Sequence, residues 1–278
     1  MRQRSITIGI ILVFLLGLTV LLYPFVSAYV NSVSQSRAVA SYREAVTMAN
    51  EKDLSDMWEA ALAYNARLRP GEDRYRFSEK SHLEYLSLLN LSGAGVMGTL
   101  EIELIGVRLP IYHGTSEGVL QVGIGHFEGT SLPVGGKGCH TAITGHRGLP
   151  SATLLTHLER LIIGDIFTLH ILDQTLYYQV DQIRIVEPDD LSLLELDPEN
   201  DYCTMITCTP YGVNSHRLLA RGRRVDGPQA PRPPEVYTEA SPVSTSFILR
   251  VLIIPLVVIL PAIRLIRWKW KQRRGANP

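Results

Sequence analysis

The sequence predicts a mainly β domain, either a barrel or a sandwich, preceded by a helical segment and flanked by two apolar segments. Between residues 96 and 225, short apolar and β-branched runs recur between turn signals, a pattern typical of all-β domains. Residues 33–68 instead carry apolar residues at helical spacing. Each end of the chain holds an apolar stretch, which predicts helices that span a membrane.

The first apolar stretch lies near the N-terminus. Ile6 to Leu22 is apolar apart from threonine and glycine, and the apolar character resumes from Phe25 to Val30. This exceeds the roughly 18 residues that indicate a spanning helix, so we expect residues 1–32 to form a transmembrane segment or signal anchor. The alternative is a signal peptide cleaved near Val26-Ser27-Ala28, although the apolar region of such peptides is typically only about 7–15 residues long.

The second apolar stretch, Phe247 to Ile263, contains one charge, Arg250, whose head group can reach the membrane interface. We expect a proline-rich linker over residues 227–245, a transmembrane helix over 246–266 and a basic cytoplasmic tail over 267–278. The basic residues between the two apolar stretches and the chain ends are Arg2, Arg4, Arg264, Arg267, Lys269, Lys271, Arg273 and Arg274. By the positive-inside rule, both termini are cytoplasmic and the domain between them is extracellular, held at the cell membrane.

The segment over residues 33–95 is expected to be helical with a polar loop. Asn50-Glu51-Lys52-Asp53 indicates a break between two helices, with Asp53 able to cap the second. Arg69 to Arg76 is charged and rich in turn-forming residues, which predicts a surface loop. The cluster Ser92-Gly93-Ala94-Gly95 marks the boundary with the β domain, residues 96–226.

Within the β domain, eight runs are expected to form strands and one stretch, Ser151 to Leu161, is expected to form a helix. The helical expectation comes from four leucines at helical spacing. The expected strands are Met97–Ile105, Arg108–Tyr112, Val119–Ile124, Cys139–Thr144, Ile166–Ile171, Leu176–Val186, Thr204–Thr207 and Leu218–Val225.

Charge and cysteine content narrow the classes of function. The chain has 27 basic and 27 acidic residues, so its net charge is close to zero and does not favour nucleic acid as a partner. Three cysteines are too few for a disulfide framework, and the odd count leaves at least one thiol free. Cys139 and Cys203 lie in β-like segments and are expected to be buried, with a bond between them left open. Cys208 lies at the end of its apolar run and is the candidate for a reactive thiol.

Three residues at predicted strand ends suggest a nucleophilic site. Cys208 is the last residue before a Pro-Tyr-Gly turn and Arg217 opens the returning run, so a hairpin brings thiol and guanidinium face to face. His146 follows another apolar run. A Cys–His pair suits acyl transfer, because the thiolate attacks and the imidazole protonates the leaving amine. Each residue alone has a structural explanation; together they favour an enzyme over a non-catalytic adhesion module.

The remaining polar residues receive supporting roles. His126, His140 and His216 are candidates for substrate contact or support, with packing or loop hydrogen bonds favoured for each. No acidic residue adjoins His146 in the sequence, so no third, acidic member of the site is expected. No spacing resembles a zinc or calcium site, and no cofactor or metal is expected.

The residues that lead up to Cys208 resemble the signature of a known family. Thr204-Met205-Ile206-Thr207-Cys208 resembles the Thr-Leu-x-Thr-Cys signature of sortases, with Met205 in place of leucine. The following residues to Leu219 are similar to the class C, pilin-polymerising group. So are the segments 109–115, 125–133, 136–138 and 144–150, and the resemblance covers roughly residues 40–225.

The resemblance implies an eight-stranded sortase β-barrel on a Gram-positive cell surface. It implies that Cys208 attacks the Thr–Gly bond of an LPXTG-like sorting signal, and that a pilin lysine resolves the thioacyl enzyme into an isopeptide bond. By matching position, His146 is the acid/base, Arg217 holds substrate and oxyanion, and Thr207 assists. The implied partners are pilin subunits and the lipid membrane; a cell-wall-anchoring sortase or a hydrolase using the same site is the alternative.

One departure from the class C pattern concerns a lid before the barrel. Class C enzymes carry an Asp-Pro-aromatic anchor there, whereas the stretch from Gly71 to Ser78 lacks Asp-Pro. Asp73 and Tyr75 are the candidates for the anchor parts of a lid within residues 33–95. A plain connector is the alternative.

Overall fold

The structure is a computed structural model that describes residues 2–227 and Arg264. The predicted linker, C-terminal transmembrane helix and tail lie outside the described residues, apart from the start of the linker and Arg264. The chain divides into two compact units, residues 1–22 with 234–278 and residues 23–233, and the second unit holds the β domain.

The described N-terminal residues form a long helix, α1 (Arg2–Met48), with Pro24 inside it. By length and composition, its residues from Ile6 onward qualify as a candidate membrane span. In its C-terminal half, Val39 and Tyr42 are buried. The helix α2 (Glu51–Arg67) follows after a short break, and Asn50 caps it by accepting a hydrogen bond from the Asp53 backbone. The cap is therefore Asn50, and the expectation for Asp53 is wrong.

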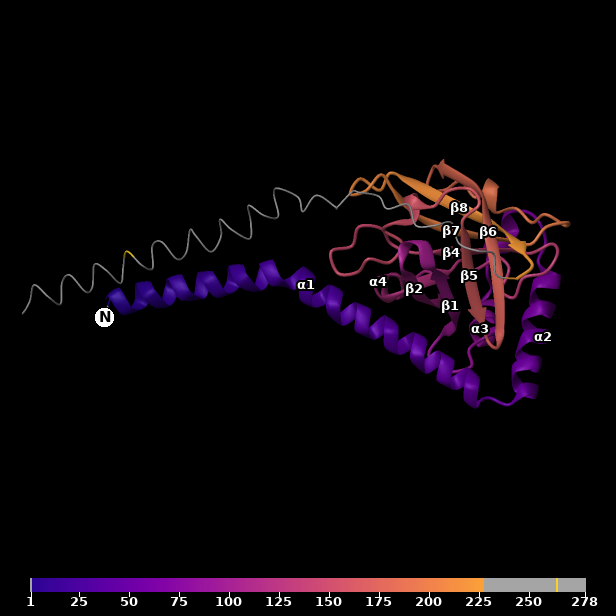
Figure 1. The fold of residues 1–278 in the computed structure, drawn as a ribbon, viewed down its shortest axis with the longest axis horizontal. Helices are drawn as coiled ribbons and strands as arrows, with labels where there is room; N and C mark the ends of the chain where they lie inside the picture. The colour runs from indigo at the N-terminus through magenta and orange to yellow at the C-terminus, as the bar shows by residue number, and fades with distance from the viewer. Residues whose placement is uncertain (1, 228–263, 265–278) are drawn as a thin grey trace, which may run out of the picture. The chain divides into compact units, whose positions relative to one another are not determined.

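A closed barrel of eight strands forms the core of the second unit, in the order β1-β2-β3-β4-β7-β8-β6-β5. The pairs β2–β3 and β4–β7 are parallel and the other pairs are antiparallel. The eight-stranded barrel predicted from the family resemblance is thus confirmed (Figure 1). The strands are β1 (Val96–Ile102), β2 (Val107–His113), β3 (Ile124–His126), β4 (His140–Thr144), β5 (Ile166–Ile171), β6 (Gln174–Val186), β7 (Tyr202–Thr209) and β8 (His216–Val225).

Short helical elements fill the connections. They are η1 (Glu72–Tyr75), α3 (Glu79–Ser87), η2 (Glu103–Ile105), α4 (Glu117–Val122), η3 (Leu158–Arg160) and η4 (Ser192–Leu194). The barrel interior is packed with buried aliphatic and aromatic side chains, among them Leu100, Phe167 and Met205. Side chains of α2 and α3, such as Ala61 and Tyr85, extend this core, so the helices are part of the folded unit.

Two expected elements differ from the structure. The run over 119–124, expected as a strand, forms α4 followed by β3. A hydrogen bond of 2.7 Å from Gln121 to Glu117, one helical turn apart, accompanies the helix. The expected helix over 151–161 is mostly turns ending in η3, because Leu154 adopts a positive φ of 39° that interrupts any helix. Its leucines are nevertheless buried in the core.

Hydrogen bonds between distant segments fix the helices to the barrel. The Tyr42 hydroxyl donates to the Met97 carbonyl at 2.8 Å and accepts from the Leu172 backbone at 2.7 Å. The Asn65 side chain donates to the Leu132 carbonyl at 3.0 Å and accepts from the Leu132 backbone at 2.7 Å. These bonds lie in buried surroundings, where an unmade hydrogen bond is costly.

We predict that Tyr42→Phe lowers the free energy of unfolding by about 1–3 kcal/mol, because it leaves a buried backbone donor and acceptor without their partner. Tyr29→Phe is the matched control, since this tyrosine is exposed on the same helix. Denaturant titration of the full chain measures both. Equal stability of the two variants would contradict the structural role of the Tyr42 hydroxyl.

Candidate active site

Cys208 and Arg217 occupy facing positions at one end of the barrel. They are partners in the antiparallel pairing of β7 with β8. Directly opposite residues of antiparallel strands project to the same face, with Cβ atoms about 4.5–5.5 Å apart. The hairpin predicted from the sequence therefore forms, and it brings the thiol and the guanidinium to one side of the sheet.

The parallel pairing of β4 with β7 brings His146 to the other side of Cys208. Every pair in this ladder has the same offset, from His140 with Tyr202 to Thr144 with Ile206. The Thr207 hydroxyl donates to the Gly145 carbonyl at 2.8 Å, and Arg147 donates to the Thr209 hydroxyl at 3.2 Å, both across 62 positions of the chain.

Those two contacts join residues that are also 62 positions apart, so the alignment of the β4–β7 ladder continues beyond the end of β4. His146 lies between Gly145 and Arg147, as Cys208 lies between Thr207 and Thr209. Neighbouring strands are about 4.8 Å apart, so the alignment puts the backbones of His146 and Cys208 side by side. The three residues form a row across adjacent segments, with Cys208 in the middle and Arg217 on its far side. We call this row the 146–208–217 row.

Alternation along β7 sends Cys208 out of the barrel core. Cys203, Met205 and Thr207 are buried on one face of the strand, whereas Ile206 and Cys208 are partly exposed on the other. Ile206 packs in a second, smaller apolar cluster outside the main core, whose buried members are Ala142, Leu194 and Leu219. The thiol thus stands at the end of an apolar patch on the outer face of β4, β7 and β8.

The three cysteines are all free, and burial distinguishes them. Burial raises the pKa of the Cys139 thiol, with the nearby Asp201 charge adding to it, and the same causes raise the pKa of Cys203 further. Both thiols therefore stay protonated and unreactive at neutral pH. Cys208 is partly exposed. The expectation of two buried thiols is confirmed, and a bond between them is not formed.

His146 has a nitrogen available for chemistry. Its Nε2 atom is buried and has no hydrogen-bond partner among residues 2–227. Glu117 Oε1 lies 3.7 Å from this nitrogen, which is too long for a hydrogen bond. The backbone of His146 is held by Leu155, which donates to its carbonyl at 3.2 Å.

Glu117 is the residue that sequence reasoning missed. It opens α4, in a region expected to be a strand, and it is 29 positions away from the histidine. The expectation that no acidic residue accompanies His146 considered sequence neighbours alone. The barrel instead brings the carboxylate close, although its side chain remains 72% exposed.

Arg217 and His216 bond to the turn that precedes them. Arg217 donates to the carbonyls of Asn214 and His216 at 3.3 and 3.1 Å, and it forms no ion pair with the described residues. His216 lies 3.3 Å from Glu187 and 2.8 Å from the Ser215 hydroxyl. His216 thus takes the loop role favoured for it, and the guanidinium of Arg217 keeps donors for a further acceptor.

His126 and His140 are placed away from the row, inside the scaffold. His126 is fully buried, bonding through its ring nitrogens to the Tyr85 hydroxyl at 3.0 Å and the Ser131 carbonyl at 2.9 Å. His140 bonds to the Glu195 carbonyl and the Thr204 hydroxyl. Burial lowers the pKa of each imidazole to about 4. Both rings are neutral at physiological pH and support the packing.

The segment around η1, where a lid was expected, is held by Arg74 and by one of the two expected anchor residues, Tyr75. Arg74 donates to the Leu194 carbonyl at 2.7 Å and to the Tyr75 hydroxyl at 2.6 Å. The Tyr75 ring lies 5.6 Å from that of Phe127. The Asp73 side chain is 96% exposed and pairs with Arg76 at 3.5 Å. Of the two expected anchor residues, Tyr75 docks against the barrel and Asp73 points to solvent.

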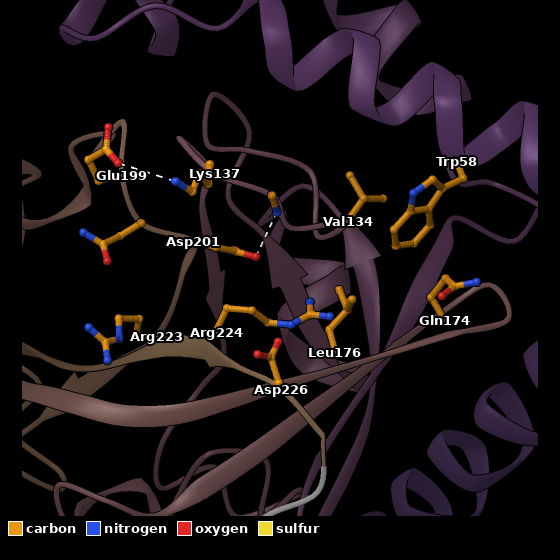
Figure 2. A pocket seen from close by; sticks show the side chains of 12 residues that line it. Trp58, Val134, Lys137, Gln174, Leu176, Glu199, Asp201, Arg223, Arg224 and Asp226 are labelled. Carbon is orange, nitrogen blue, oxygen red and sulfur yellow. Dashed lines mark hydrogen bonds and ion pairs between the residues drawn. The ribbon is translucent and has the colours of Figure 1, made fainter.

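A hollow of about 530 Å³ lies at the opposite end of β7 from Cys208 (Figure 2). Figure 2 shows Trp58 on one side of it and Asp201, Arg223, Arg224 and Asp226 around the other. Asp201 accepts hydrogen bonds from the Gly136 backbone at 2.8 Å and the Tyr178 hydroxyl at 3.1 Å. The Asp201 carboxylate thus has hydrogen-bond donors within the protein. The hollow is lined by none of the residues of the 146–208–217 row.

Comparison with known proteins identifies the relatives of this arrangement. Residues 100–225 match the family model described as a sortase domain. A curated relative, sortase D of Bacillus subtilis, is 30% identical over 131 residues, which are 46% of this chain and 63% of that protein. The matched region thus spans less than two thirds of that relative.

Solved structures cover more of the chain. Sortase C1 of Streptococcus agalactiae is 45% identical, with a TM-score of 0.66, over 69% of this chain and 100% of that chain. A sortase C structure from Streptococcus pneumoniae, described as informative on catalysis and pilin substrate specificity, is 44% identical with a TM-score of 0.61. It covers 70% of this chain and 99% of that one. The chain is therefore similar to class C sortases over the whole of their solved structures.

The buried histidines generate a pH prediction. Between pH 6.5 and 5, the unfolded chain takes up protons at His126 and His140 while the folded chain does not, because their folded pKa is about 4. The free energy of unfolding therefore decreases as the pH is lowered, by up to about 1.4 kcal/mol per pH unit for each histidine. Thermal unfolding midpoints measured from pH 7 to 5 should fall accordingly.

Burial raises the pKa of the Asp201 and Glu128 carboxyls, which acts in the opposite direction, so a substitution is needed to isolate the histidine contribution. His126→Gln, which cannot take up a proton at this site, should make the pH dependence shallower even though it lowers stability at pH 7. A variant with the same slope as the unmodified chain would show that His126 does not titrate as described.

Proposed function

The chain belongs to the sortase family of cysteine transpeptidases, and from this premise we propose that it assembles pili. In this proposal Cys208 cleaves an LPXTG-like sorting signal between Thr and Gly, and the resulting acyl group is joined to a lysine of a pilin subunit. The observation that carries the proposal is the 146–208–217 row, in which Cys208, whose thiol is partly exposed, pairs with Arg217 on one side and is flanked by contacts to the neighbours of His146 on the other.

The row assigns a role to each group in the first half of the reaction. The Cys208 sulfur attacks the threonine carbonyl carbon, and the carbonyl π electrons move to oxygen. Arg217, whose charge persists at any physiological pH, donates hydrogen bonds to that oxyanion; such a donor is typically worth about 3–4 kcal/mol. The tetrahedral intermediate collapses, the C–N bond breaks, and protonated His146 gives its proton to the leaving glycine amine.

The second half reverses these roles. The lysine amine of a pilin subunit attacks the thioester carbon and passes a proton to His146, which the first half left neutral. The C–S bond breaks, and Cys208 departs as the thiolate. The product is an isopeptide bond, and the enzyme returns to its starting protonation state. The Thr207 hydroxyl supports the row by holding Gly145, next to the histidine.

The choice of pilin as substrate rests on similarity. Solved structures similar to this chain include proteins named sortase C1 and sortase C, and one of them is described in terms of pilin substrate specificity. The candidate membrane span in α1 supports a protein held at the cell membrane. Arg2 and Arg4, which precede the apolar stretch, favour a barrel on the extracellular side. A membrane-held enzyme meets subunits that are themselves delivered at that surface.

We further propose that the segment around η1 is a lid, anchored by Arg74 and Tyr75. Arg74 holds the carbonyl of Leu194, and Leu194 belongs to the apolar patch that includes Ile206, two residues before the nucleophile. The backbone of Arg74 also lies tightly against Gly129, where an added Cβ would come within 2.6 Å of its carbonyl oxygen. The lid thus contacts the apolar patch at Leu194, and the same patch includes Ile206 close to Cys208.

The central test incubates the enzyme with a sorting-signal peptide and with pilin subunits. We predict a thioacyl adduct of the peptide by mass spectrometry and a ladder of covalent multimers with the subunits. Cys208→Ala should lose both, and Cys139→Ala, the matched control at a buried thiol, should keep both. An adduct without a ladder would indicate a hydrolase or a cell-wall-anchoring enzyme, and an adduct in Cys208→Ala would overturn the nucleophile.

For the lid, we predict that Arg74→Ala raises the rate of thioacylation by peptide several-fold, because the segment loses its bond to Leu194 and uncovers the patch. Arg76→Ala is the control, since this arginine is exposed and bonds only Asp73 among the described acidic groups. Adduct formation over time measures the rates. The same rate in Arg74→Ala and the unmodified enzyme would favour a plain connector.

A further inference from the structure

Arg147 is a nearly buried arginine that the proposed reaction does not use. Its side chain is only 10% exposed, and its Nε atom is buried without a hydrogen-bond partner among the described residues. Removing a guanidinium from water is costly unless its charge and donors are matched. A residue kept in this position needs an explanation from its contacts.

Those contacts join three segments of the chain. One terminal nitrogen donates to the Thr209 hydroxyl at 3.2 Å, and the other lies 3.0 Å from a carboxylate oxygen of Glu159, the middle residue of η3. The guanidinium carbon lies 5.9 Å from the centre of the Tyr211 ring. Arg147 thus connects the loop after β4, the end of β7 and the turn that leads to β8.

A glycine completes the junction. Gly148 has a φ of 75°, and a Cβ there would come within 2.9 Å of the Tyr211 ring. The loop after β4 and the turn after β7 therefore approach each other as closely as backbone and an aromatic ring allow. This contact and the Arg147 bridge lie directly beyond the last residues of β4.

Arg147 and Thr209 are the immediate chain neighbours of His146 and Cys208. The ladder between β4 and β7 ends at Thr144 with Ile206, and the Thr207 hydroxyl extends it to Gly145. The next link with the same offset is the one from Arg147 to Thr209. Links on both sides therefore bracket the pair formed by the imidazole and the thiol.

We infer that Arg147 is a positioning residue whose guanidinium sets the separation of the His146 imidazole and the Cys208 thiol. This inference rests on the proposed roles of those two residues. The planar fork of arginine holds the Thr209 hydroxyl and the Glu159 carboxylate at once, which the single ammonium of lysine cannot reproduce. Loss of the bridge frees the loop, and a misplacement of about 1 Å in a reacting group can cost about a hundredfold in rate.

The first experiment compares thioacylation kinetics in Arg147→Ala, Arg147→Lys and Thr209→Val. We expect kcat to fall about ten- to hundredfold in all three with KM within about twofold, because substrate contacts are unchanged. Arg160→Ala, an exposed arginine on η3, should match the unmodified enzyme. Rates are expressed per active site, titrated by alkylation of Cys208, so that unfolded protein does not count.

A double-mutant cycle then tests whether the two residues act as a unit. The combined variant, Arg147→Ala with Thr209→Val, should be no slower than the slower single variant, because residues in one contact are not additive. Losses that multiply, a KM that rises at constant kcat, or activity in Arg147→Ala within twofold of the unmodified enzyme would each overturn the inference.

A substrate-free readout separates this inference from the proposed function. The rate of Cys208 alkylation by iodoacetamide is measured against pH in the unmodified enzyme, His146→Ala and Arg147→Ala, with Glu117, the carboxylate facing His146, left in place. We expect both variants to change the profile in the same direction. If they do while no peptide forms an adduct, the proposed function fails and the inference stands. An unchanged profile in either variant overturns the inference.

Discussion

The site depends on one constraint, the parallel pairing of β4 with β7 in a fixed register. Neighbouring parallel strands end at the same edge of a sheet, so the loop after β4 begins where β7 presents Cys208. An antiparallel pairing would leave that loop at the far end of β7, on the order of 20 Å away at about 3.3 Å per residue. A slip by one residue would turn the thiol into the core, because side chains alternate between faces. The burial of Met205 and Thr207 fixes the register against such a slip.

Burial also divides residues of the same type into structural and chemical groups. The imidazoles of His126 and His140 are enclosed, bonded at both ring nitrogens and held neutral, whereas His146 keeps a nitrogen without a partner among the described residues. The thiols divide in the same way, with Cys139 and Cys203 enclosed and Cys208 partly open. Residue identity therefore says little by itself; the face of the strand on which a residue lies decides what it can do.

Local signals in the sequence were enough to predict part of this arrangement. The apolar run, the Pro-Tyr-Gly turn and the returning run specified the hairpin of Cys208 and Arg217, because hairpins form between neighbours in the chain. His146 could be assigned to a strand end because it directly follows an apolar run, which is also a local signal. The pairing of β4 with β7 joins residues 62 positions apart and has no local signal, so the sequence did not predict it. That His146 meets Cys208 was a hypothesis drawn from their positions at predicted strand ends. Glu117 was missed because its segment, rich in valine and leucine, favoured a strand by composition, and the helix that forms there is only six residues long.

Two arginines hold chain segments around this outer face, and their partners make the two contacts different in kind. Arg147 has a carboxylate partner at 3.0 Å and a hydroxyl acceptor, so most of the cost of its desolvation is offset and its loop is held firmly. Arg74 bonds a carbonyl and a tyrosine hydroxyl, and two of its nitrogens are buried without partners among residues 2–227. Unmatched donors of a buried charge lower the free energy needed to return it to water. In our proposals, Arg147, which is paired with Glu159 although its Nε has no partner among the described residues, fixes the reacting groups, and Arg74, which has no ion pair among those residues, holds the lid. Such an arrangement keeps the row rigid while the lid gives way to substrate.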